Sequence, residues 1–179
     1  MKRILAIALA LLLVGCAALA EAAAQDAGFV FRNGITWGMT PEQVAAAENN
    51  PDADAYDDEA LCFMEFEDVG ALAGLEGDAN YIFLNHALVV CGYQFDLENA
   101  DLETVLAAMT AVYGEPTDSD PAALNAMLGN LYDSTDELAD DAFFAGWTLP
   151  DGTYVGMTDS FGDIEVAFLD VAVLNAEVE

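Results

Sequence analysis

A capped helix followed by apolar, strand-like segments occurs twice in this chain, and this order limits its fold more than any other feature. The first helix is predicted over residues 41–49. Thr40 suits the N-cap position, Pro41 suits the first helical position, and Gln43 completes a capping box with Thr40. Val44 is expected to face the sheet.

The segments after this helix alternate apolar and polar residues, as half-buried strands do. Residues 61–69, LCFMEFEDV, show this alternation clearly, and residues 70–79 are predicted to form a loop. Residues 80–97 contain two apolar runs on either side of Asn85-His86, a pair suited to a two-residue hairpin turn. The first half of the chain therefore predicts one strand and one hairpin after the helix.

The second half repeats this order with a longer helix. Asn99 or Asp101 can cap its start, and Gly114 is predicted to end it. A shorter helix is predicted after Asp120 as the N-cap, with Pro121 at its first position. The apolar residues at helical spacing in the longer helix are Leu102, Val105, Leu106, Met109 and Val112. Three strands are predicted to follow, over residues 143–149, 153–158 and 164–174.

Together these elements predict an α+β fold, in which one antiparallel sheet carries two to three helices on one face. The repeated order favours a duplicated unit of a helix, a strand and a hairpin. The sequence predicts a single folded domain over residues 29–175, preceded by a short tether over residues 21–28.

The first 20 residues have the features of an export signal. Lys2 and Arg3 precede an apolar run over residues 4–14, which is shorter than the about 20 residues that a membrane-spanning helix needs. Two processing sites are consistent with the sequence. LVGC, ending at Cys16, resembles a lipobox, in which the cysteine becomes the lipid-bearing N-terminus. ALA, ending at Ala20, fits ordinary signal peptidase and would remove Cys16. Either site predicts export, and Cys16 is the candidate lipid-attachment residue.

The charge balance excludes several classes of partner. The chain has 33 acidic residues, 3 basic residues and a formal net charge of −30. After removal of the signal, Arg32 is the one remaining basic residue. A field of this sign repels nucleic acids and anionic lipid headgroups and disfavours phosphoryl transfer. Hydrophobic residues nevertheless make up 55 % of the chain, which predicts a folded core rather than a disordered acidic chain.

Two cysteines, Cys62 and Cys91, remain in the domain. Export permits a disulfide between them, which would contribute about 3 kcal/mol by restricting the unfolded chain. The alternative is a pair of buried thiols that pack as small hydrophobic side chains. A metal site is disfavoured because the chain has no C-x-x-C motif and one histidine.

No catalytic, cofactor-binding or metal-binding residue can be assigned from the sequence. The acidic segment 50–59 lacks the glycine and the final glutamate of an EF-hand loop, and segment 133–141 is explained by a capping box at Ser134 and Glu137. Both are expected to be solvated and to bind divalent cations loosely. His86 is expected in a surface turn. Strand spacing predicts core positions for the aromatic residues Trp37, Tyr93, Phe95, Phe143, Phe144 and Trp147.

One motif carries a resemblance to known families. WGMTPEQVAAAE, over residues 37–48, and the later YGEP resemble small exported bacterial domains. The motif is similar to one in the small lipoprotein subunit of the outer-membrane β-barrel assembly machinery, and to the β-lactamase-inhibitor-protein fold, which doubles a helix–sheet unit. The resemblance implies a protein-binding or scaffold role and no enzymatic activity.

The sequence thus predicts a non-enzymatic protein of the cell envelope, either a lipoprotein or a secreted interaction module that binds another envelope protein. The membrane would be reached through a lipid on Cys16. An extracytoplasmic protein that binds cations or small ligands on its acidic surface is the alternative. Neither nucleic acid nor a cofactor is expected as a partner.

Overall fold

A computed structural model describes residues 28–50, 53, 55–58, 60–97, 100–132, 142–160 and 162–176. The signal segment with Cys16, most of the tether and the acidic segment 133–141 lie outside these residues. None of the helices in the described part of the chain has the length and apolar character that crossing a bilayer needs.

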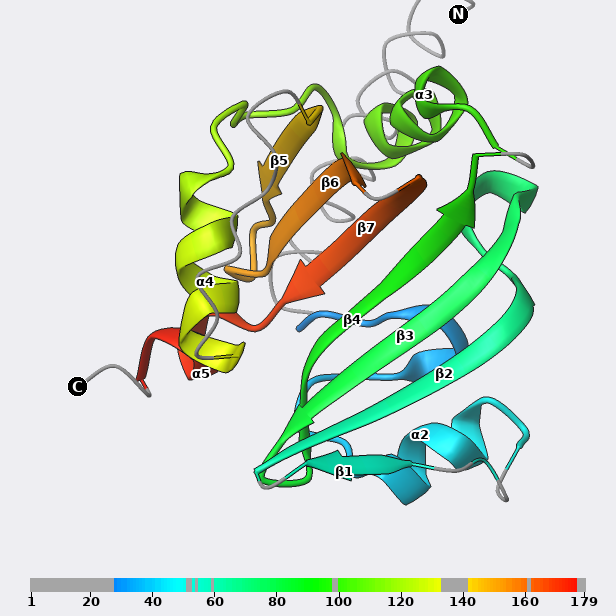
Figure 1. Cartoon of the computed structure of the whole chain (residues 1–179), viewed down its shortest axis with the longest axis vertical. Coiled ribbons are helices and arrows are strands. Elements are labelled where there is room, and N and C mark those ends of the chain that lie inside the picture. The colour runs from blue at the N-terminus through cyan, green and yellow to red at the C-terminus, as the bar shows by residue number, and fades with distance from the viewer. Residues whose placement is uncertain are drawn as a thin grey trace, which may run out of the picture.

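Seven antiparallel strands form one sheet in the described residues (Figure 1). Their order across the sheet is β1-β2-β3-β4-β7-β6-β5. The strands are β1 (Tyr56–Asp58), β2 (Leu61–Gly70), β3 (Glu76–Leu84), β4 (Ala87–Asp96), β5 (Phe144–Thr148), β6 (Tyr154–Ser160) and β7 (Asp163–Leu169). Strands β2–β4 and β5–β7 are two meanders, each following a helix, and their last strands pair as β4 and β7. The structure therefore confirms the α+β fold with an antiparallel sheet.

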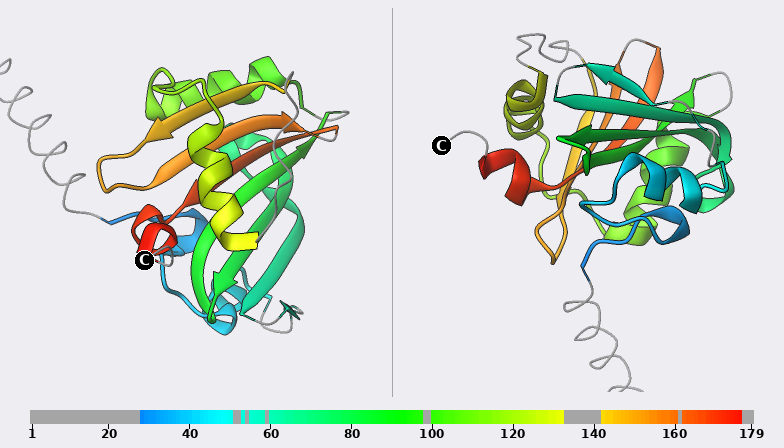
Figure 2. Two further views of the ribbon diagram at one scale, coloured as in Figure 1. Left: turned by 60° about the vertical axis from the view of Figure 1, so that its left-hand side comes forward. Right: turned by 90° about the horizontal axis from the view of Figure 1, so that it is seen from below.

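Helices lie on both faces of this sheet (Figure 2). We call the face covered by α2 (Pro41–Ala47) and α3 (Leu102–Tyr113) the inner face, and the face that carries α4 (Ala122–Tyr132) and α5 (Val171–Ala176) the outer face. The sequence predicts two to three helices on one face, but α4, which is one of the predicted helices, lies on the other face together with α5. Leu124 and Leu174 anchor these two helices in a second apolar cluster. The apolar pattern of a helix does not determine which face of the sheet the helix covers, because both faces of this sheet present apolar side chains.

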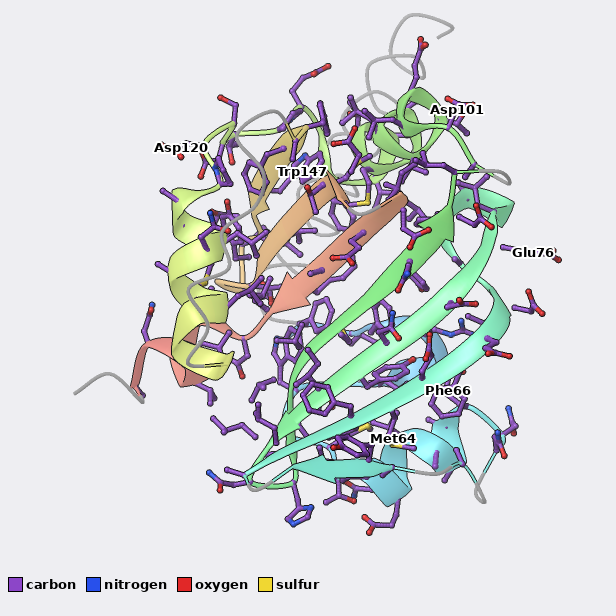
Figure 3. All side chains as sticks on the ribbon, in the orientation of Figure 1. Met64, Phe66, Glu76, Asp101, Asp120 and Trp147 are labelled. Atoms are coloured by element: carbon purple, nitrogen blue, oxygen red, sulfur yellow. The ribbon has the colours of Figure 1, made fainter. Side chains whose placement is uncertain are left out.

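The main core lies on the inner face. The aromatic residues predicted to fill a core are buried there or packed against it, with the exception of Phe144, which is buried in the cluster on the outer face. The N-terminal segment adds Phe29, whose ring stacks on Trp37 with centroids 4.3 Å apart. Met64 and Phe66 of β2 point to the same side (Figure 3). Alternation along β2 therefore positions Cys62, Met64 and Phe66 inside, up to the β-bulge that follows Phe66.

Helix α2 begins at the capping box predicted for it. The Gln43 amide N–H donates to Thr40 Oγ1 at 3.4 Å, and the Thr40 amide N–H donates to Gln43 Oε1 at 2.9 Å. Val44 is fully buried against the sheet. Helix α3 also starts as predicted, because Asp101 Oδ1 accepts from the Thr104 N–H, while the other candidate cap, Asn99, lies outside the described residues. Helix α4 begins at Ala122, one residue after the predicted first position, and Asp120 Oδ1 accepts from the Ala122 N–H (Figure 3).

Thr40→Ala is expected to lower the free energy of unfolding by about 1 kcal/mol, because it removes the acceptor for one N–H of the first helical turn. Pro41→Ala is expected to cost less, since the first helical position needs no hydrogen-bond donor. Chemical denaturation of both variants tests this order. If Pro41→Ala proves the more damaging change, the cap is not what stabilises the start of α2.

Local turn chemistry explains the β3–β4 hairpin. Asn85 and His86 both have positive φ, at 50° and 63°, which the two-residue hairpin turn requires. The predicted loop 70–79 is shorter than expected. The 3₁₀ turn η2 (Leu72–Gly74) closes it, and β3 already begins at Glu76. Pairing of Val69 with Gly77 after a β-bulge extends the hairpin into that segment.

The predicted strand 164–174 is wrong in its second half. Strand β7 ends at Leu169, and the Asp170 carboxylate accepts from the Ala172 and Val173 N–H groups at 3.1 and 3.3 Å. Asp170 thus caps the short helix α5. Strand-like alternation continues past Asp170 in the sequence, but the cap starts a helix there and ends the strand.

Cys62 and Cys91 are buried, and no disulfide joins them. Cys62 pairs with Phe83 and Cys91 with Tyr81, so strand β3 lies between the two cysteines. Two strand spacings separate their Cα atoms by at least about 9.5 Å, whereas a disulfide needs about 4.4–6.8 Å. Of the two alternatives that the sequence leaves open, the disulfide is therefore incompatible with this sheet. Both cysteines pack as small hydrophobic side chains, and burial raises the pKa of the Cys91 thiol well above its ordinary value.

Candidate functional site

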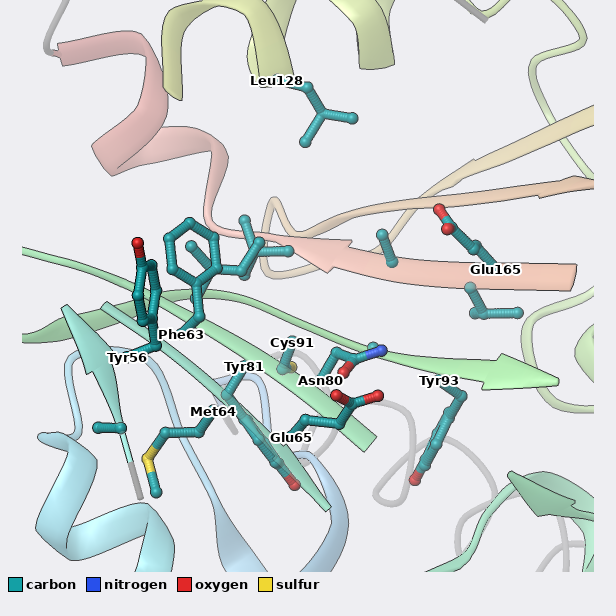
Figure 4. A pocket seen from close by; sticks show the side chains of 16 residues that line it. Tyr56, Phe63, Met64, Glu65, Asn80, Tyr81, Cys91, Tyr93, Leu128 and Glu165 are labelled. Carbon is teal, nitrogen blue, oxygen red and sulfur yellow. The ribbon is translucent and has the colours of Figure 1, made fainter. Parts of the chain in front are cut away.

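A trough on the outer face of the sheet is the candidate functional site (Figure 4). It has a volume of about 740 Å³ and extends over β2, β3, β4 and β7, between β1 and helix α4. The residues that face it by strand alternation, or from the bordering elements, are Tyr56, Phe63, Glu65, Asn80, Ile82, Val90, Gly92, Leu128, Glu165 and Ala167.

Two small residues form the lowest part of its floor. Gly92 of β4 lies opposite Ala167 of β7, and Asn80 of β3 lies opposite Gly92 on the other side. Glycine has no side chain and alanine only a methyl group, so the sheet surface is low where these strands meet. The meeting of the two meanders at β4 and β7 thus creates the depth of the trough.

Aromatic and aliphatic side chains form one end. Tyr56 of β1 pairs with Phe63 of β2, and their ring centroids are 6.4 Å apart. Leu128 of α4 faces them across the trough (Figure 4). Tyr56 is 69 % exposed. Such high exposure is unusual for an aromatic residue next to an apolar pocket.

Carboxylates and amides form the other end. Asn80 Nδ2 donates to Gln94 Oε1 at 3.3 Å, and Gln94 Nε2 donates to Asp163 Oδ2 at 2.8 Å. Glu65 lies opposite Asn80, and Glu165 lies opposite Gln94. A hydrogen-bonded row of side chains across three strands is therefore bordered by a glutamate at each side.

Glu165 lies on the rim of the trough, where its side chain is exposed and its surroundings disfavour the charged form. Partial desolvation raises its pKa above the ordinary value, and the neighbouring Asp163 carboxylate raises it further. A cation would relieve both effects. The one basic residue of the domain, Arg32, pairs with Glu48 instead, beside α2 and under the inner face. The trough carboxylates therefore have no lysine or arginine of this domain as a partner.

The variant Glu165→Gln is expected to be more stable than the natural chain at pH 7, by a melting-temperature rise of about 1–2 °C. Because the folded-state pKa of Glu165 is raised, the carboxyl favours the fold below its ordinary pKa, and this contribution is lost as the pH rises through the raised pKa. The gain should therefore vanish near pH 3. Glu103→Gln, which removes a favourable charge from the first turn of α3, should show no gain. An equal gain in both variants would contradict the argument.

A second, smaller cavity of about 500 Å³ lies at the end of β2, β3 and β4, lined among others by Asp68, Glu76, Asp78 and Asp96. Asp78 Oδ1 accepts from the Asp68 amide N–H at 3.0 Å. Within the described residues, no three histidine, cysteine or acidic side chains are arranged to hold a metal ion. The expected loose binding of divalent cations stays a prediction.

The sequence-based candidates contribute little to the trough. His86 is exposed in the hairpin turn and lies outside the lining. Of segment 50–59, Tyr56 and Ala55 line the trough, while Asp57 and Asp58 belong to β1. The sequence does not indicate Glu65 and Glu165 as site residues. Alternation predicts that each glutamate lies on the polar face of its own strand, but it does not predict that the two strands share one sheet face around a trough.

No protein-family model, curated protein or solved structure matches this chain.

Proposed function

We propose that this chain is a non-enzymatic binding protein of the bacterial cell envelope, and that the trough on its outer sheet face binds another protein. The observation that carries the proposal is the composition of the trough. An exposed aromatic side chain beside partly buried apolar side chains and polar groups is typical of protein-binding surfaces. Tyr56, being highly exposed and next to Phe63, is suited to the role of an anchor.

Two further features support binding rather than catalysis. The single histidine of the chain, His86, is outside the trough, so a histidine-dependent nucleophile there has no base within this chain. The motif that resembles small exported bacterial domains forms the start of α2. A kinship with the small subunit of the β-barrel assembly machinery, or with β-lactamase inhibitor proteins, is part of this proposal.

Site-specific photocrosslinking tests the proposed surface. A photoreactive phenylalanine analogue at Tyr56, in the full chain produced in its own cell, should yield a discrete crosslinked protein. The matched control is the same analogue at Val112, which is 59 % exposed on α3. Equal crosslinking from both positions, or none from Tyr56, would count against the outer face as the binding surface.

The envelope location depends on processing of the first 20 residues. If Cys16 is the lipidated residue, the chain should incorporate labelled palmitate and partition into detergent, and Cys16→Ala should abolish both. Such a protein has two or three acyl chains, which suffice for stable anchoring. A mature N-terminus at Glu21 without label would instead show a secreted protein.

A further inference from the structure

We propose that the trough recognises a protein segment that carries a lysine or arginine next to an aliphatic or aromatic side chain. This inference rests on the proposed function, and it adds the chemistry of the partner. It follows from three properties of the trough: the sign of its charge, the direction of its hydrogen bonds and the separation of its apolar and polar ends.

Charge complementarity indicates a cation. Glu65 and Glu165 border the polar end, with Asp163 next to Glu165. The only arginine of the domain is held by Glu48 at 3.0 Å, away from the trough. Because no basic side chain of the domain can neutralise these carboxylates, a basic residue of a partner would gain the full interaction on binding.

Hydrogen bonds within the trough also favour a donor. Asn80 donates its amide N–H to Gln94, and Gln94 donates in turn to Asp163. Asn80 can therefore present its carbonyl oxygen to a ligand, next to the carboxylate of Glu65. Ammonium and guanidinium groups carry donors only, so they match these acceptors.

The apolar end requires a second group on the partner. Tyr56, Phe63 and Leu128 border a surface whose floor is Ile82 and Val90, which lie in line with Phe63 across the sheet. Burial of an aliphatic or aromatic side chain there would remove apolar area from water on both partners. Because one trough contains both ends, the two groups must lie close together on the same segment.

A pair of synthetic peptides serves as the probe. One is a short fluorescent peptide of alternating leucine and lysine, and the other replaces leucine by serine at the same charge. Fluorescence anisotropy with the full-length chain, in about 150 mM salt to screen general attraction, should show at least tenfold tighter binding of the leucine–lysine peptide. Equal affinity for both peptides would overturn the role of the apolar end.

Two double variants test the charges. Glu65→Gln/Glu165→Gln is expected to weaken binding of the leucine–lysine peptide at least tenfold. Glu103→Gln/Glu115→Gln removes the same charge from the first turn of α3 and from the residue that follows its C-cap, and should change affinity less than twofold. Equal losses in the two variants would show general attraction to an acidic protein and overturn the proposal.

Tyr56→Ala provides a variant that should remain folded, because the side chain is mostly exposed. It is expected to weaken the leucine–lysine peptide about tenfold and to leave the serine–lysine peptide unchanged. Thermal unfolding verifies that each variant is folded. If Tyr56 crosslinks a partner in cells while no trough variant affects the peptide, the inference fails and the proposed function stands. If Tyr56 crosslinks nothing, the proposed function fails.

Discussion

Arg32→Met is expected to lower the free energy of unfolding by about 3–5 kcal/mol, because it leaves a buried carboxylate without its counter-ion. Arg32 Nε lies 3.0 Å from Glu48 Oε1, and the two side chains are 16 % and 2 % exposed. Asn33 Nδ2 donates to Glu48 Oε2 at 2.9 Å, and the Tyr81 hydroxyl donates to Glu48 Oε1. Burial and this hydrogen bond raise the pKa of Tyr81, so its hydroxyl remains a donor.

This ion pair joins three parts of the fold. Arg32 belongs to the 3₁₀ turn η1 (Arg32–Gly34), Glu48 is the C-cap of α2, and Tyr81 is in β3. The single basic residue of the domain therefore fixes the N-terminal segment and the end of α2 to the inner face of the sheet. Loss of Arg32 is therefore expected to destabilise the whole domain.

A double variant separates charge from packing. Arg32→Met/Glu48→Gln replaces the pair by neutral side chains and keeps an acceptor for Tyr81, so it is expected to recover most of the loss of Arg32→Met. Urea denaturation of the two single variants and the double variant gives the coupling. A double variant less stable than Arg32→Met would show that packing, and not the buried charge, sets the cost.

The sequence predicts the starts of α2 and α3 and the hairpin turn correctly, because these features depend on residues that are close together in the chain. The cap at Thr40, the cap at Asp101 and the turn at Asn85-His86 depend on residues within a few positions of each other, and the structure has all three. Alternation likewise indicated β2, and the two apolar runs around the turn indicated β3 and β4. Alternation past Leu169 predicts a longer β7 than the structure has, because alternation takes no account of the Asp170 side chain, which caps a helix.

The trough could not be predicted because it depends on pairing between distant strands. Glu65 and Glu165 are separated by a hundred positions in the sequence and border one cavity because β4 pairs with β7. Arg32 and Glu48 are a similar case, since nothing in either local pattern indicates their contact. Helix α4 covers the outer face for the same reason, as Leu124 finds space above Gly156 of β6.

Gly92→Ala is expected to lower the free energy of unfolding by about 3 kcal/mol, at the upper end for overpacking a single methyl group. A Cβ atom at Gly92 would lie 2.4 Å from the Val166 carbonyl oxygen and 3.2 Å from the Ala167 Cα. Both are backbone atoms of β7, which cannot move away without disturbing the pairing of the two meanders. The loss of stability therefore arises at the β4–β7 pairing, which links the two meanders and forms the floor of the trough.

Gly70→Ala is the matched control, because a Cβ at Gly70, at the end of β2, has no atom within 4 Å. That change is expected to alter stability by less than about 0.5 kcal/mol, or to stabilise slightly by restricting the unfolded chain. Urea denaturation of the two variants measures the difference. In Gly92→Ala, the hydrogen-exchange rates of the β4 and β7 amides should increase more than those of the β2 and β3 amides, since the strain is local to the β4–β7 pairing. Equal stability of the two variants would mean that β4 and β7 are further apart than the structure places them.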